Sequence, residues 1–232
     1  MRGLDTRFAA LGLACALTAG LLTGCTAKMT TFDAATYVQG VLDETYKGTW
    51  DAVFLDLVDQ TEAEAKQAYA DAVDEEYQRF CYQFDLRDSY LTDSTREQVT
   101  DFLKELTAKA SYSVKGATAL DDARYAVEVA VRPMDLFQQV AQDDLKDFTK
   151  EFQDGHSTAS LDGIDAAGRE RFWTSYENAW ARGVLKLCRD KLGLLGYGDV
   201  ETILVLVAPD DAGLYGMGDN DFSNLSALVL PY

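Results

Sequence analysis

Three aromatic side chains in the second half of the chain, Trp173, Tyr176 and Trp180, have the types and the spacing to act together. They follow one another at intervals of three and four residues, so on a helix they would form one continuous stripe. Aromatic rings arranged in this way suit stacking on a sugar or a peptide, which makes these three the candidate ligand-binding residues. The more common role of such a stripe is packing, and the expected packing partner here is a sheet.

Residues suited to nucleophilic or metal chemistry are sparse. His156 is the only histidine, and it lies beside Ser157 in a polar loop over residues 154–163. A Ser-His-acid site needs its histidine held rigidly against the nucleophile, which neighbours in a flexible loop rarely achieve. Zinc sites need several His or Cys ligands, and the sequence has no Cys-x-x-Cys pair. We therefore assign no catalytic residue, no metal and no cofactor, and we favour a non-catalytic protein.

Acidic pairs supply the alternative prediction. Glu75-Glu76 and Asp143-Asp144 could provide the two carboxylates of a glycosidase, which would make the protein a hydrolase of cell-wall or extracellular substrate. With 39 acidic residues in the chain, such pairs are also expected on solvated faces by composition alone. Asp219-Asn220-Asp221 could open a calcium loop, but the glycine and glutamate needed further on are missing, so the segment predicts helix capping.

The first 25 residues predict where the protein is located. Arg2 and Arg7 precede the uncharged run Phe8–Leu22, which is shorter than the roughly 20 residues of a membrane-spanning helix and predicts an export signal. The run ends in Leu22-Thr23-Gly24-Cys25, and these four residues resemble the lipobox of bacterial lipoproteins. The resemblance implies that residues 1–24 are removed and that Cys25 receives a diacylglyceryl thioether. The alternative is a membrane-retained signal with an incidental cysteine.

The charge of the chain limits its partners. It has 21 basic and 39 acidic residues, a formal net charge of −18, which disfavours nucleic acid and direct docking on anionic lipid. We expect the lipid on Cys25 to hold the protein on the extracytoplasmic face of the cell membrane, because two acyl chains give stable anchoring. Residues 25–31 would then be the lipidated cysteine and a short spacer. The expected partner is a small ligand or another envelope protein.

Two further cysteines, Cys81 and Cys188, follow the signal segment and Cys25. Both fall on the apolar sides of predicted helices, which favours buried free thiols. An extracytoplasmic location would also permit a disulfide between them. We predict that both are reduced.

Helical periodicity dominates the first half of the chain. A helix capped by Asp33 is expected to end at Gly48. Two capping boxes, Thr61-x-x-Glu64 and Ser94-x-x-Glu97, predict helices over residues 61–86 and 94–110.

A period of two residues then predicts strands. The alternation over residues 125–131 indicates a strand with one buried face, preceded by a strand near Tyr112 and Val114. Residues 202–207 are apolar on both faces and predict a central strand that is covered on both sides. Between these strands, helices are expected from Asp135 and over residues 165–192, the second ended by Gly193 in the left-handed conformation.

Together these elements predict one α+β domain over residues 32–232, predominantly helical, with a small antiparallel sheet of about four strands. This layout behind a lipobox resembles functionally uncharacterised surface lipoproteins of Gram-positive bacteria. The resemblance implies no catalytic or binding residues. The predicted function is a lipid-anchored, non-catalytic binding module for an unknown ligand. A two-lobed solute receptor is disfavoured because repeated βα units are missing.

Overall fold

The computed structural model describes residues 29–120, 123–156, 161, 163–211 and 213–232. It confirms a predominantly helical α+β fold with one four-stranded antiparallel sheet. No helix within these ranges is long and apolar enough to cross a membrane. The elements are, in order, α1 (Thr31–Lys47), α2 (Ala52–Val58), α3 (Glu62–Gln83), η1 (Asp88–Tyr90), α4 (Asp93–Thr107), β1 (Ser111–Ala119), β2 (Tyr125–Arg132), α5 (Leu136–Gln139), η2 (Val140–Asp144), α6 (Leu145–Gly155), α7 (Ala166–Leu192), β3 (Glu201–Pro209), β4 (Tyr215–Met217) and α8 (Asp219–Val229).

The sheet has the strand order β1-β2-β3-β4, with every neighbouring pair antiparallel. Tyr125 lies at the turn end of this sheet, opposite Ala119 of β1 and Val207 of β3. A bulge interrupts the β1–β2 register between Val114 and Gly116. The strands therefore pair in chain order: β1–β2 and β3–β4 are hairpins, and α5, η2, α6 and α7 are inserted between β2 and β3.

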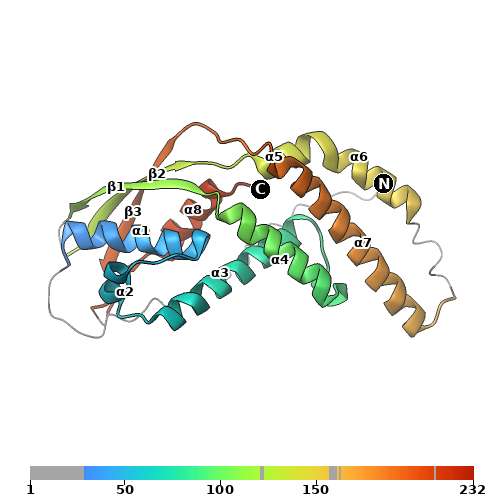
Figure 1. The fold of residues 1–232 in the computed structure, drawn as a ribbon, viewed down its shortest axis with the longest axis horizontal. Coiled ribbons are helices and arrows are strands. Elements are labelled where there is room, and N and C mark those ends of the chain that lie inside the picture. The colour runs from blue at the N-terminus through green and yellow to red at the C-terminus, as the bar shows by residue number, and fades with distance from the viewer. Residues whose placement is uncertain (1–28, 121–122, 157–160, 162, 212) are drawn as a thin grey trace.

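Helices α1 and α8 contact one face of this sheet, as Figure 1 shows for α1. Val205 and Val207 of β3 are fully buried toward the helices, whereas Leu204 and Leu206, on the other face, are 63% and 36% exposed. The prediction of a central strand was right, because β3 lies between β2 and β4. The prediction of cover on both sides was wrong, because a run of apolar residues does not show whether a second layer of helices exists.

The residues that cap the helices agree only in part with the predicted ones. Thr61 and Glu64 form the predicted capping box at the start of α3. The box predicted at Ser94 was wrong, because α4 is capped by the hydroxyl of Thr92, which accepts from the Thr95 amide at 3.4 Å. In α1 the cap is Thr30, and Asp33 is its partner inside the first turn of the helix.

The end of α7 and the start of α5 also differ from the predictions. Gly193 has φ of −70°, so α7 does not end in a left-handed glycine. Asp135 makes no side-chain cap at α5; its carboxylate instead accepts from the Gly196 amide at 2.8 Å, which ties α5 to the segment after α7. The helix expected from Asp135 is divided into α5, the π-helical turn η2, and α6.

Helices α6 and α7 form a hairpin that extends away from the sheet, at the right of Figure 1. Gly183 of α7 permits their close approach, because a Cβ atom there would lie 2.1 Å from Cζ of Phe148 on α6. Cys81 and Cys188 are both buried, free thiols, as predicted. Burial raises the pKa of Cys81 to about 11 and that of Cys188 to about 12, which makes both thiols unreactive at neutral pH.

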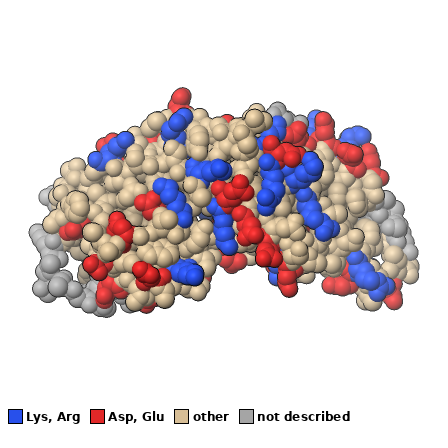
Figure 2. Space-filling view, viewed as in Figure 1, with Lys and Arg blue, Asp and Glu red and all other residues tan. Residues whose placement is uncertain are grey.

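Charged side chains of both signs lie side by side over the middle of the face shown in Figure 2. Contacts of one charged side chain also join α4 to α7. Arg189 lies 4.0 Å from the Glu105 carboxylate and donates to the Gln98 carbonyl oxygen at 3.4 Å. These exposed pairs contribute little to stability, and α7 is held to the rest of the protein mainly by buried contacts.

Candidate binding groove

An open groove of about 590 Å³ lies where the α6–α7 hairpin meets the loop that follows α3. Its size is in the range of small-molecule and peptide sites. The side chains that define it include the three predicted aromatics and a set of polar groups, Asp85, Arg87, Thr149, Gln153 and Glu177. The structure thus brings all three predicted residues together at one concave surface.

The stripe packs on α6 and not on the sheet, which corrects the expected partner. The indole of Trp180 stacks on Phe148 with ring centroids 5.0 Å apart and meets the edge of Phe152 at 5.1 Å. Its Nε1 donates a hydrogen bond to the Phe84 carbonyl oxygen at 2.8 Å. Trp180 therefore has a structural role as well as a place in the groove.

The other two aromatics are also engaged by neighbours. Tyr176 stacks on Phe172 at 5.8 Å and meets Phe152 edge to face at 5.0 Å. Trp173 meets the Tyr176 ring at 5.4 Å and carries the Arg87 guanidinium 3.9 Å above its centroid. Since each ring already has a neighbour over one face, the groove offers less room for stacking on a sugar than the sequence suggested.

Glu177 and Arg87 form the central polar contact. Glu177 is only 2% exposed, and its Oε1 accepts from Arg87 Nε at 2.6 Å and forms an ion pair with Nη2. Its Oε2 accepts from the Arg87 backbone amide at 3.1 Å. Buried carboxylates are usually paired and hydrogen-bonded in this way. The contact fixes the loop after α3 against α7.

The sequence contained a signal for Glu177 that was not used. Glu177 lies four residues after Trp173 and three before Trp180, so it belongs to the same face of α7 as the aromatic stripe. A charged residue within an apolar stripe implies a partner of opposite charge. The identity of that partner, Arg87, could not be found in this way because it lies 90 residues earlier.

Asp85 lies at the end of α3 and has a left-handed backbone. Its φ is +52°, in the left-handed region, although it is not glycine. Its side chain is exposed and lines the groove, and within the described chain no partner is seen for its carboxylate. Aspartate adopts this conformation more readily than most residues, and Asp85 occupies it directly after the end of α3, where the Leu86 amide donates to the Cys81 carbonyl oxygen at 2.8 Å.

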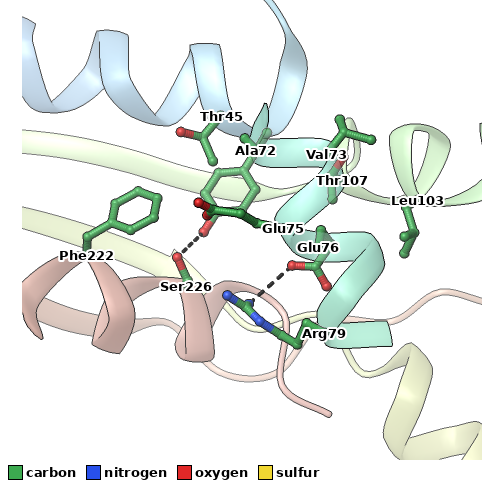
Figure 3. A pocket seen from close by; sticks show the side chains of 11 residues that line it. Thr45, Ala72, Val73, Glu75, Glu76, Arg79, Leu103, Thr107, Phe222 and Ser226 are labelled. Atoms are coloured by element: carbon green, nitrogen blue, oxygen red, sulfur yellow. Dashed lines mark hydrogen bonds and ion pairs between the residues drawn. The ribbon is translucent and has the colours of Figure 1, made fainter. Parts of the chain in front are cut away.

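The acidic pair Glu75-Glu76 lines a second, much smaller cavity of about 30 Å³ (Figure 3). Glu76 is 8% exposed, so the expectation of a solvated face was wrong for this residue. It forms an ion pair with Arg79 at 3.2 Å and accepts a hydrogen bond from the Tyr232 hydroxyl. Burial raises its pKa. The cavity holds about one or two waters, which is too small for a sugar.

The remaining sequence candidates have structural roles or lie outside the described residues. His156 stacks on Phe152 with centroids 4.1 Å apart, and its Nδ1 lies 2.9 Å from the Phe152 carbonyl oxygen. Asp144 pairs with Lys191 at 3.1 Å. Asp221 accepts from the Leu206 amide at 2.8 Å, and α8 has no side-chain cap. Ser157, the Asp143 side chain and the lipobox with Cys25 are not among the described groups.

Metal binding has no evident place in the described part of the chain, where no three His, Cys, Asp or Glu side chains are grouped to hold an ion.

The first described residue, Met29, is fixed at the turn end of the sheet, because its carbonyl oxygen accepts a hydrogen bond from the Tyr125 hydroxyl. The described part of the chain therefore begins at that end of the sheet.

The fold is similar to one in a solved structure, that of a candidate lipoprotein, ycdA, from Bacillus subtilis subsp. subtilis strain 168. The TM-score is 0.51 at 16% sequence identity, and the similarity covers 86% of this chain and 56% of the other. The chain thus spans little more than half the length of that structure. At this identity the similarity shows a shared fold. No family model and no curated protein matches the sequence.

Proposed function

We propose that this chain is a lipid-anchored envelope protein, attached through Cys25 to the extracytoplasmic face of the cell membrane. It binds a ligand or another surface protein in the groove between α6, α7 and the loop after α3. The anchor is supported by Leu22-Thr23-Gly24-Cys25 and by a structural neighbour that is itself described as a candidate lipoprotein. The binding role is supported by the groove.

The observation that carries the binding role is a rigid cation with unused donors. Arg87 is held by Glu177 and Trp173, yet its side chain remains 43% exposed at the groove. An arginine in one fixed orientation binds a ligand with less loss of entropy than a mobile one. Polar groups from α6, among them the exposed amide of Gln153, face the same space.

The position of the groove relative to the anchor agrees with this role. Three residues lie between Cys25 and Met29, which makes four Cα–Cα steps, so the lipid would lie within roughly 14 Å of the turn end of the sheet. The first turn of α1 marks that end at the left of Figure 1, whereas α6 and α7 lie at the right. A groove in this half would open toward partners beyond the lipid surface.

A carboxylate-based hydrolase fits these residues less well. Such an enzyme needs two available carboxyl groups some 5–9 Å apart around the substrate. The acids of the groove are Asp85 and Glu177, and Glu177 already accepts hydrogen bonds from the side chain and the backbone of Arg87. Only one carboxylate is available, which favours binding over hydrolysis.

Site-specific photocrosslinking tests the binding role. A benzoylphenylalanine at position 153, an exposed glutamine of the groove, would be introduced into the lipidated protein in its own cells. The same group at the exposed Val53 of α2 is the control. The proposal expects an adduct by mass spectrometry at position 153 that is absent at position 53. Identical adduct patterns, or no adduct at position 153, would contradict it.

A further inference from the structure

The guanidinium of Arg87 has one edge occupied and one edge free. Glu177 takes the edge formed by Nε and Nη2. The opposite edge, formed by Nη1 and the second hydrogen of Nη2, has no acceptor among the described residues. Because Trp173 lies beneath the guanidinium plane at 3.9 Å, this free edge is held in one orientation at the groove.

A free guanidinium edge has a preferred partner. Its two parallel N–H groups match the two oxygens of a carboxylate, and such bidentate pairs are stronger and more directional than single hydrogen bonds. A carboxylate bound there would lie in the plane of the Arg87 guanidinium. The aromatic side chains of α7 would then face the part of the ligand next to its carboxylate.

Asp85 provides the opposite charge in the same groove. Its carboxylate is exposed and has no partner among the described residues, and it is fixed two residues before Arg87 by a left-handed backbone. The natural ligand group for such a carboxylate is an ammonium. The amides of Gln83 and Gln153 line the same groove and can donate to and accept from backbone groups of a ligand.

The net charge of the groove favours a ligand with one positive and one negative group over a simple anion. Arg87, Glu177 and Asp85 together carry a net charge of about −1 at neutral pH, in a chain whose formal net charge is −18. An anion would approach against this field, whereas a ligand with one positive and one negative end would not. The groove is therefore suited to a neutral, two-ended molecule with apolar groups along its length.

We propose that the groove binds a short peptide with free termini, whose carboxylate pairs with the free edge of Arg87 and whose ammonium pairs with Asp85. This inference rests on the proposed function and names the class of its ligand. A sugar fits less well, because each ring of the stripe already has a neighbour over one face.

The test uses the full lipidated chain in detergent micelles and a pool of tripeptides with randomised side chains. The pool is offered with free termini, with acetylated N-termini, or with amidated C-termini. Binding is followed by tryptophan emission, since Trp173 and Trp180 line the groove, and by native mass spectrometry. We expect the free pool to bind and each blocked pool to bind at least about tenfold more weakly, as loss of a charged hydrogen bond implies.

Three variants test whether Asp85 and Arg87 are the residues that bind the peptide termini. Asp85→Asn keeps a residue that tolerates the left-handed backbone, and Arg87→Lys keeps the charge beside Glu177 but loses the fork. Asp56→Asn, at an exposed acid of α2, controls for net charge. The first two should weaken binding of the free pool about tenfold and the third should not.

Two results would overturn the inference: blocked pools that bind as tightly as the free pool, or no binding of the free pool at all. An adduct at position 153 in the crosslinking experiment would then still support the groove as a binding site for another class of ligand. Loss of both signals would reject the proposed function itself.

Discussion

Glu177 on α7 accepts hydrogen bonds from both the backbone amide and the side chain of Arg87, a residue 90 positions earlier in the chain. This contact closes the loop after α3 against the α6–α7 hairpin and fixes the orientation of the guanidinium over Trp173. The groove thus depends on one buried carboxylate.

Glu177→Gln should lower the free energy of unfolding by about 1–3 kcal/mol, because an amide cannot replace the charge-assisted bonds to Arg87. Denaturant titration of residues 26–232 measures the difference. Glu170→Gln, at an exposed site on the same helix, should change stability by less than about 0.5 kcal/mol. Equal midpoints for the two variants would show that the contact contributes nothing to the fold.

Trp180→Ala should cost about 2–4 kcal/mol, since Trp180 is half-buried, stacks on Phe148 and bonds to the Phe84 carbonyl. Trp180→Phe retains a ring and should cost less, about 1 kcal/mol for the lost hydrogen bond. A loss below about 1 kcal/mol for the alanine variant, the range of ordinary surface changes, would mean that Trp180 serves the ligand and not the fold.

Gly183 within α7 and Gly193 at its end should respond in opposite ways to alanine. Gly183→Ala places a Cβ atom 2.1 Å from Phe148 and should destabilise the α6–α7 hairpin by about 1–3 kcal/mol. Gly193→Ala meets no atom within 4 Å and has helical φ, so it should be neutral or stabilise by about 0.5 kcal/mol. Thermal unfolding of both variants decides this, and a stable Gly183→Ala protein would refute the close helix approach.

Glu44 on α1 should make stability depend on pH. Burial raises its pKa from 4.5 to about 7 in the folded protein, and its Oε1 has no hydrogen-bond partner. Between these pH values the folded state holds a proton that the unfolded state releases, so stability should fall as pH rises from about 4.5 to 7, by up to about 3 kcal/mol. In Glu44→Gln this fall should be smaller, and the part that remains is expected from Glu76, whose pKa burial also raises. An unchanged pH profile in that variant would assign the dependence to other groups.

Lipidation is tested apart from the fold. Cys25→Ser should leave the precursor uncut and without lipid, because only the thiol is alkylated by the lipid donor. Intact-mass spectrometry of membrane fractions reads this directly. A wild-type protein that begins at an ordinary signal-peptidase site, with no acyl mass on Cys25, would refute the anchor.

Local patterns predicted much of the fold, and long-range contacts account for the errors. The capping box at Thr61 was correct because a box is satisfied within four residues. At the start of α4 both Thr92 and Ser94 carry a hydroxyl that could cap the helix. Thr92 is the cap, because Asn178 of α7 holds it in place by accepting hydrogen bonds from its amide and its hydroxyl. No local pattern contains that contact.

Local patterns also predicted part of the groove, and long-range contacts account for the part that was missed. The spacing of Trp173, Tyr176 and Trp180 placed them on one face of one helix, and all three line the groove. Their packing partner was mistaken because Leu204, on the second face of the sheet, is exposed, and no helix of the described residues covers that face. Arg87 and Asp85 were missed because their roles arise only where the loop after α3 meets α7, and their neighbouring residues show no pattern.

Hydrogen exchange tests most directly whether this groove is where the protein binds. The lipidated wild-type protein would be compared with and without an extract of the cell envelope that contains its native partners. The account predicts slower exchange in residues 83–87 and 173–180, and unchanged exchange in α2. Protection elsewhere with none in these two segments, or no protection anywhere, would contradict it.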